Sequence, residues 1–226
     1  MIELRDLSRV YHRGADEVRA LDRLTLCIPA GCFVALMGPS GSGKSTLLNI
    51  VAGLDRPTEG TVRVSGQDLG RLGEGALAAF RARHIGFVFQ FFNLLPVLSA
   101  RENVELPLLL TRLTRAERRV RTATALGVVG LGARADHRPA ELSGGEQQRV
   151  AIARAIVTDP ALVIADEPTG DLDARNADGV LSLLRELRRG FDKTVLIVTH
   201  DARAERYVDE TVRLDKGQLV VPSAAA

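Results

Sequence analysis

The stretch that decides the fold is Cys32-Phe-Val-Ala-Leu-Met-Gly-Pro-Ser-Gly-Ser-Gly-Lys-Ser-Thr46, in which an apolar run passes directly into a glycine-rich loop. A continuous apolar run of this kind is typical of a parallel strand buried on both faces. The loop fits the pattern Gly-x4-Gly-Lys-Ser/Thr, and we expect a helix at 45–52, ended by Gly53. The loop residues are Gly38, Pro39, Ser40, Gly41, Ser42, Gly43, Lys44, Ser45 and Thr46.

A loop with this pattern predicts a phosphate-binding site. Its glycines tolerate the dihedral angles that turn backbone N–H groups inward, toward an anion. We expect Lys44 to lie against the β- and γ-phosphates of a nucleotide and the Ser45 hydroxyl to bind Mg²⁺. The positive N-terminal end of the following helix adds to the attraction.

Three further apolar runs alternate with helical segments along the chain. Alternating strands and helices predict an α/β fold with a mainly parallel sheet, and chemistry in such folds gathers beyond the carboxyl ends of the strands. Each run ends in a polar residue at that edge. The runs are Ile85–Phe89, Ala161–Ala165 and Thr194–Thr199, followed by Gln90, by Asp166 and Glu167, and by His200, with helices expected at Gly144–Val157 and Ala174–Arg189.

The chain is expected to form one domain with inserted parts. The N-terminal stretch is predicted to form short strands, with Ile2, Leu4 and Leu7 as its apolar pattern. Residues 1–90 and 142–220 are assigned to the core with this β subdomain, 91–141 to a helical subdomain, and 221–226 to a frayed tail. The most clearly amphipathic stretch of the helical subdomain is Arg115–Leu126. Its four arginines are interpreted as a solvated helix face: Arg115, Arg118, Arg119 and Arg121.

The polar strand ends suggest the chemistry of hydrolysis. Asp166 suits Mg²⁺ bound through water, and Glu167 suits a general base that deprotonates an attacking water. The amide of Gln90 can contact both the metal and that water, and a ring nitrogen of His200 can hydrogen-bond the γ-phosphate. Tyr11 is a candidate for stacking on a nucleotide base. A purely structural role, as a half-buried aromatic residue of a strand, accounts for its position almost as well.

The segment Leu142-Ser-Gly-Gly-Glu-Gln-Gln-Arg carries a second anion-binding signal. Ser143 and Glu146 form the sequence pattern of a capping box that opens a helix. Gly144 and Gly145 destabilise the first turn of the helix by roughly 1 kcal/mol each. Their presence is explained if the lack of side chains leaves backbone N–H groups accessible to an anion. Because the chain's own phosphates already have a loop, this helix end points to a nucleotide held by another subunit.

Composition excludes several other classes. The net charge of +2 is too small to indicate nucleic-acid binding, and no apolar run is long enough to span a membrane. No N-terminal targeting segment is recognised, so a soluble, cytoplasmic protein is expected. Cys27 and Cys32 are interpreted as small core residues.

Taken together and in order, these motifs make the chain resemble the nucleotide-binding subunit of an ABC transporter along its whole length. The resemblance implies that two subunits pair head to tail around two ATP and Mg²⁺, each ATP lying between the loop Gly38–Thr46 of one chain and Ser143–Gly145 of the other. It implies that Tyr11 stacks on adenine and that Asp173 crosses the dimer interface. Glu146 and Asp171 depart from the commonest pattern of the family, and neither departure removes a catalytic group.

A finer resemblance rests on four stretches: Gly53-Leu-Asp-Arg-Pro-Thr-Glu-Gly, Phe89–Pro96, Glu102-Asn-Val-Glu-Leu-Pro-Leu and Glu167-Pro-Thr-Gly-Asp-Leu-Asp. It is to the ATPases of lipoprotein release, macrolide efflux and a similar cell-division system. It implies a homodimer, or a pair with a similar ATPase subunit, held on the inner face of the membrane by an integral permease. Four apolar residues then belong either to the core of the helical subdomain or to a groove for the permease: Phe91, Phe92, Leu94 and Leu95.

Two alternatives to transport remain at this stage. A regulator of cell-division or cell-wall machinery would hydrolyse ATP identically and differ only in its membrane partner. A DNA-repair or chromosome ATPase would carry long coiled-coil or zinc insertions between the motifs, which this chain lacks.

Overall fold

A six-stranded sheet with the order β10-β9-β3-β8-β7-β6 forms the centre of the computed structural model, which describes residues 1–14 and 16–220. Every pairing in this sheet is parallel except that of β10 with β9. The predicted α/β class with a mainly parallel sheet is therefore confirmed, and the tail 221–226 lies outside the described residues. The strands are β3 Phe33–Met37, β6 Ile85–Val88, β7 Leu162–Asp166, β8 Thr194–Val198, β9 Glu210–Asp215 and β10 Gln218–Val220.

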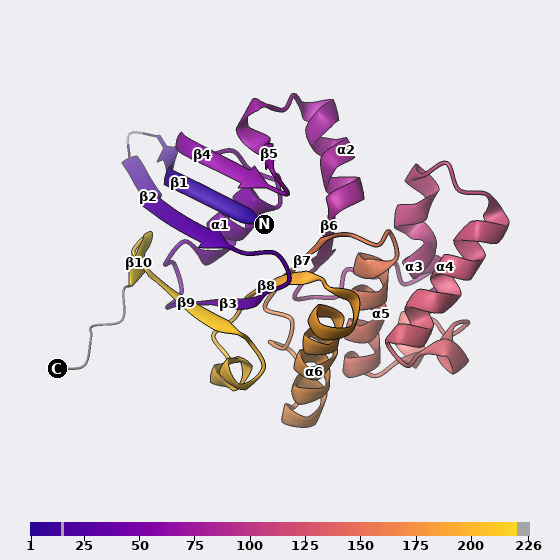
Figure 1. The fold of residues 1–226 in the computed structure, drawn as a ribbon. Helices are drawn as coiled ribbons and strands as arrows, with labels where there is room; N and C mark the ends of the chain where they lie inside the picture. Colours follow the sequence, from indigo (N-terminus) through magenta and orange to yellow (C-terminus); the bar gives the residue numbers. More distant parts are fainter. Residues whose placement is uncertain (15, 221–226) are drawn as a thin grey trace.

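Strand β3 is buried on both faces, as its unbroken apolar sequence requires. Phe33 and Ala35 point into one hydrophobic cluster, whereas Val34 and Leu36 point into another on the opposite face. The first cluster includes helices α5 Gly144–Ile156 and α6 Ala174–Phe191, and the second includes α1 Lys44–Val51. Figure 1 shows α1 and the N-terminal strands on one side of the central sheet and α5 and α6 on the other.

The N-terminal strands form a separate antiparallel sheet with the order β2-β1-β4-β5, which confirms the predicted β subdomain. Ile2, Leu4 and Leu7 are all buried in the second cluster. Their spacing changes from two to three because the register shifts between Leu4 and Leu7, where Asp6 adopts a φ of 47°. The strands are β1 Ile2–Arg13, β2 Asp16–Ile28, β4 Glu59–Val64 and β5 Gln67–Asp68.

Residues 91–141 are helical and lie to one side of the sheet, beyond α5 (Figure 1). Their two α-helices, α3 Ala100–Glu105 and α4 Arg115–Val128, each begin with a complete capping box, at Ser99 and Thr114 respectively. Apolar residues of both helices join the same cluster as α5 and α6. The segment also holds the short 3-10 turns η2 Leu106–Leu110, η3 Gly132–Arg134 and η4 Pro139–Glu141.

Three sequence-based interpretations are wrong or incomplete. Cys27 is exposed because it lies on the outward side of β2, next to the buried Ile28. Arg118 is not part of a solvated face, since its Nε donates to the Glu105 Oε1 at 2.9 Å and its side chain is mostly buried. The helix α2 Glu74–His84, the turns η1 Leu69–Arg71 and η5 Ala202–Arg206, and the strands β9 and β10 were not predicted. Among the described residues, no helix has the length and apolar character needed to cross a membrane.

Candidate active site

The loop from Gly38 to Thr46 connects β3 to α1, as its sequence predicts. Gly41 and Gly43 adopt φ angles of 78° and 99°, which L-residues with a side chain rarely reach. A Cβ on Gly43 would also collide with the Ala20 carbonyl oxygen of β2. Glycine is therefore required here both by the backbone angle and by the close approach of the neighbouring strand.

Lys44 is buried at the first position of α1, and its ammonium group faces the loop. The Nζ donates to the carbonyl oxygens of Gly38 at 2.9 Å and Pro39 at 2.8 Å. An ammonium group has three N–H donors, so one further donor remains for a ligand. The Ser42 hydroxyl is also buried and has no hydrogen-bond partner in the described structure, which makes it a polar atom suited to an anion in the loop.

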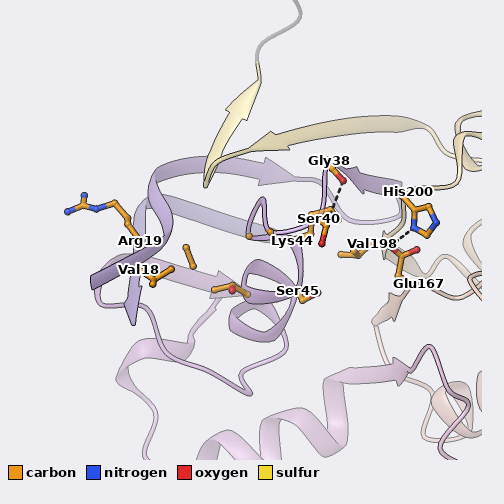
Figure 2. Close-up of a pocket in the computed structure, with 13 residues that line it drawn as sticks. Val18, Arg19, Gly38, Ser40, Lys44, Ser45, Glu167, Val198 and His200 are labelled. Atoms are coloured by element: carbon orange, nitrogen blue, oxygen red, sulfur yellow. Dashed lines mark hydrogen bonds and ion pairs between the residues drawn. The ribbon is translucent and has the colours of Figure 1, made fainter. Parts of the chain in front are cut away.

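A cavity of about 620 Å³ opens over this loop. Figure 2 shows Lys44 and Ser40 in its middle, Glu167 and His200 at one end, and Val18 and Arg19 of β2 at the other. The loop, the end of β7 and the segment after β8 thus meet at one edge of the sheet, as expected for parallel strands.

Glu167 directly follows β7, and its backbone is strained, with a φ of 47°. Its N–H donates to the Val198 carbonyl at 2.9 Å, which fixes the residue to the end of β8. Its Oε1 lies 3.0 Å from the Nδ1 of His200, whereas its Oε2 is buried and has no partner among the described residues. The hydrogen bond to Glu167 and the attraction of its charge raise the pKa of His200.

Asp166 and Gln90 lie near this edge but do not line the cavity. Burial and the neighbouring charge of Glu167 raise the pKa of Asp166. The Gln90 side chain is directed toward the loop that follows Glu167, with its Nε2 3.3 Å from the position of a Cβ on Gly170. The two residues therefore flank the loop that carries the predicted base.

Tyr11 is a partly exposed strand aromatic with polar contacts at both its hydroxyl and its ring. Its hydroxyl donates to Asp55 Oδ2 at 2.7 Å, and the Arg9 guanidinium lies 4.4 Å from the ring centroid. The ring does not line the cavity, but Tyr11 pairs with Val18 across the two strands, and Val18 does line it. Cross-strand partners share a face of the sheet, so Tyr11 lies beside the cavity and not in it.

Ser143 begins α5 with the predicted capping box. Its Oγ accepts from the Glu146 N–H at 3.3 Å, and Glu146 Oε2 accepts from the Ser143 N–H at 2.9 Å. Ser143 and Gly144 are exposed, and neither they nor Gly145 line the cavity of their own chain. Asp173 caps α6 by accepting from the Asn176 N–H at 2.9 Å.

Sequence reasoning missed the wall that β2 contributes to the cavity. Val18, Arg19 and Ala20 carry no motif, and only the pairing of β2 with β1 brings them over the phosphate loop. The chemical pattern could not reveal them because their position depends on a tertiary contact. By contrast, Gly38–Thr46 was found by its glycine-rich pattern, and Glu167 and His200 were found by their positions after buried strands.

The fold and the cavity together define a P-loop nucleotide-binding domain. The sequence model of the family described as "ABC transporter" matches residues 21–170. The chain belongs to this family, which confirms the resemblance recognised in the sequence.

Individual relatives cover nearly the whole chain. A lipoprotein-releasing system ATP-binding protein, LolD of Chromohalobacter salexigens, is 51% identical over 219 residues, covering 97% of this chain and 92% of the relative. A macrolide export ATP-binding/permease protein, MacB of Hyphomonas neptunium, is 45% identical over 99% of this chain, which spans 34% of that longer protein. A solved dimeric ATP-binding cassette in a post-hydrolysis state, bound to ADP and Pi, has a TM-score of 0.89 at 42% identity, covering 98% of this chain and 97% of the other.

Proposed function

We propose that this chain binds and hydrolyses ATP as one of two paired subunits and thereby drives a membrane permease of the lipoprotein-release or macrolide-efflux type. The observation that carries the proposal is one cavity that joins the Lys44 loop to the Glu167–His200 pair. The predicted ATPase class agrees with the family and with the solved cassette that holds ADP and Pi. The partnership with a permease is supported by LolD and MacB, whose names join an ATP-binding component to release or export.

The loop Gly38–Thr46 binds the phosphates. Its backbone N–H groups, the buried Ser42 hydroxyl and the remaining N–H of Lys44 all supply hydrogen-bond donors around the start of α1. This arrangement fits a polyanion because no acidic residue occurs in the first turn of α1. Tyr11 lies beside the cavity wall formed by Val18 and provides the aromatic surface for adenine.

The residues at the sheet edge also fit Mg²⁺. Two adjacent carboxyl groups, Asp166 and Glu167, stand at the end of β7, and burial together with the charge of Glu167 raises the pKa of Asp166. A divalent cation would offset the repulsion between the two charges. We assign Ser45 and Gln90 as ligands and Asp166 as a ligand through water; bound there, the ion would neutralise charge that develops on the phosphates.

Glu167 acts as the general base. Its Oε2 has no hydrogen-bond partner among the described residues, so we assign this oxygen to accept the proton of the attacking water, while Oε1 is held by His200. His200 is mostly exposed on the cavity side, so its ring can donate to the γ-phosphate and hold the reacting groups in line. Gln90 orients the water from the other side of the Glu167 loop.

The second half of the site comes from the partner subunit. The exposed Ser143 and Gly144 and the N-terminal end of α5 offer donors that face no ligand of their own chain. We assign Ser143, Gly144 and Gly145 to the ATP held by the other copy, and Asp173 to the interface between the copies. The solved dimeric cassette supports this arrangement at 42% identity.

The permease would meet the exposed apolar part of the helical segment. The exposed fractions of Phe91 and Leu95 are 71% and 46%, whereas Phe92 and Leu94 are half-buried and Leu94 packs against the core. We therefore assign Leu94 to the core of the helical segment and the exposed Phe91 and Leu95 to the contact with the permease. In this proposal 91–141 acts as the helical subdomain between core segments 1–90 and 142–220, and the protein sits on the inner face of the cell membrane through its permease.

Glu167→Gln tests the proposed function directly. The amide cannot accept the proton of the attacking water, so we expect turnover of ATP to fall about 10²–10⁴-fold while ATP still binds and holds the two chains together. Phosphate release, nucleotide affinity and the mass of the complex are the measurements. Lys44→Ala is the control, because it should weaken nucleotide binding itself; near-normal turnover by Glu167→Gln would overturn the assignment.

A further inference from the structure

The loop that follows Gln90 is held in an unfavourable conformation. Phe92 and Asn93 adopt φ angles of 53° and 49°, consecutive left-handed values that cost free energy for a residue with a side chain. Asparagine tolerates this region, but a bulky phenylalanine does not. Contacts outside the loop must therefore stabilise the turn.

Arg154, on the third turn of α5, supplies these contacts. Its Nη2 donates to the Phe92 carbonyl oxygen at 2.7 Å, and its Nη1 donates to the neighbouring Asn93 carbonyl. Burial lowers the pKa of Arg154, and no carboxylate of the described residues forms an ion pair with it. The two carbonyl oxygens of the strained turn are thus the polar partners of a half-buried guanidinium, and its rigid fork fits two adjacent acceptors.

The same helix holds the loop at a second point. Phe92 Cζ lies 3.9 Å from the position of a Cβ on Gly144, at the first turn of α5. The turn is thereby attached both to the N-terminal end of α5 and, through Arg154, to a position near its C-terminal end. The position of the turn is therefore coupled to that of α5, chiefly through the two hydrogen bonds of Arg154.

Helix α5 also reaches the loop that carries the predicted base. Gln148 is fully buried, and its Nε2 donates to the Pro168 carbonyl at 2.8 Å, one residue after Glu167. Gln90 in turn lies beside Gly170 of the same loop. A single helix that begins at Ser143 therefore contacts the segments of both Gln90 and Glu167.

We propose that Arg154 is a positioning residue for hydrolysis: it locks the turn at Phe92 and Asn93 onto α5 and so fixes Gln90 beside the Glu167 loop. This inference rests on the proposed function, because Gln90 matters for turnover only if the cavity hydrolyses a nucleotide. It adds a specific consequence: a shift of α5 caused by the partner's nucleotide at Ser143–Gly145 is passed to Gln90 through Arg154.

The loop itself provides the first readout, independent of activity. The chain contains no tryptophan, so Phe91→Trp, at an exposed position next to the turn, introduces a single fluorescent reporter. We expect Arg154→Met in this background to lower the steady-state anisotropy of the tryptophan and to speed amide exchange at 91–94. Arg118→Met is the matched control, because Arg118 also donates to a loop carbonyl, that of Leu113, but has no contact with the Gln90 loop.

Turnover provides the second readout. A misplacement of about 1 Å at a reacting group can cost on the order of 10²-fold in rate, so we expect Arg154→Met to lower kcat about 10- to 100-fold. KM for ATP should stay within about twofold, since Arg154 does not line the nucleotide cavity. Arg154→Lys retains the charge but has no guanidinium fork, so its kcat should lie between those of the wild type and Arg154→Met. Arg118→Met should leave both kcat and KM unchanged.

The outcomes separate the two proposals. If the wild-type chain hydrolyses ATP but Arg154→Met changes neither anisotropy nor kcat, the positioning role is wrong. A loss of thermal stability with unaltered kcat per folded molecule would assign Arg154 to the fold alone and would equally overturn it. Absence of ATP turnover in the wild-type chain would refute the proposed function instead, while the anisotropy would still test the Arg154 contact. Should Arg154→Met fail to fold, the same two measurements on Arg154→Lys decide the question.

Discussion

At the scale of single residues, the contact between Glu167 and His200 has a measurable electrostatic consequence. The hydrogen bond to Glu167 raises the His200 pKa above its ordinary value of 6.5. Since the folded pKa exceeds the unfolded one, the imidazolium contributes stability that is complete below about pH 6.5 and is lost as the pH rises through the folded pKa. We expect an NMR titration of the His200 ring to show this upward shift, and Glu167→Gln to move the pKa back toward 6.5. An identical titration in both proteins would exclude the pairing.

For single residues, a sequence motif predicts the position of a loop but not the contacts of its side chains. The residues Gly38–Thr46 were predicted because local spacing alone dictates a glycine-rich turn between a strand and a helix. The direction of the Lys44 ammonium toward two loop carbonyls, and the contacts of Tyr11 with Asp55 and Arg9, depend on neighbours that spacing does not specify. The contact of Arg154 with Phe92 links residues 62 positions apart, so a local sequence pattern cannot predict it.

At the scale of elements, three helices begin in the same way but only one is assigned to a nucleotide. Ser99, Thr114 and Ser143 each form a capping box with a glutamate three residues later. Removal of such a cap typically costs about 1 kcal/mol of stability. We expect Thr114→Ala to lower the free energy of unfolding by about this amount and to leave turnover of ATP unchanged.

Ser143→Ala is the companion to that variant. Its loss of stability should be similar, about 1 kcal/mol, but turnover should fall as well because the hydroxyl also faces the partner's nucleotide. Urea unfolding and phosphate release, measured on both proteins, separate the two effects. Equal turnover in the two variants would reduce Ser143 to an ordinary helix cap.

The elements that were predicted are those with strong apolar patterns. Strands β3, β7 and β8 are buried on both faces and appear in the sequence as unbroken apolar runs. Helix α2 was missed because only Leu77 and Phe80 of its 11 residues are buried, too few to define a stripe. Strand β9 was missed because only Val212 and Leu214 are buried in it, too few apolar residues to define an alternating pattern, and β10 is only three residues long.

At the scale of the whole molecule, one chain carries two separate surfaces, each of which we assign to one half of an ATP site. The cavity over Gly38–Thr46 contains the predicted base but no residue of Ser143–Gly145, of which Ser143 and Gly144 lie exposed at the start of α5. A chain of this family was predictable from the order of its motifs, because each motif is local. The glycine-rich start of α5 already pointed to a nucleotide of another subunit, whereas the head-to-tail pairing came only from the resemblance, since that contact is made between chains.

A mixture of two inactive variants tests this division of the site. In a head-to-tail pair of one Glu167→Gln chain with one Ser143→Arg chain, one site carries both lesions and the other carries neither. Random pairing of equal amounts makes half of the dimers mixed, so with independent sites we expect turnover to recover to about a quarter of the wild-type value. The control mixture of Glu167→Gln with Lys44→Ala places one lesion in each site and should stay inactive. If mixed dimers form, as shown by capture through a tag on one variant, and both mixtures stay equally inactive, then Ser143 does not serve the site of the other chain.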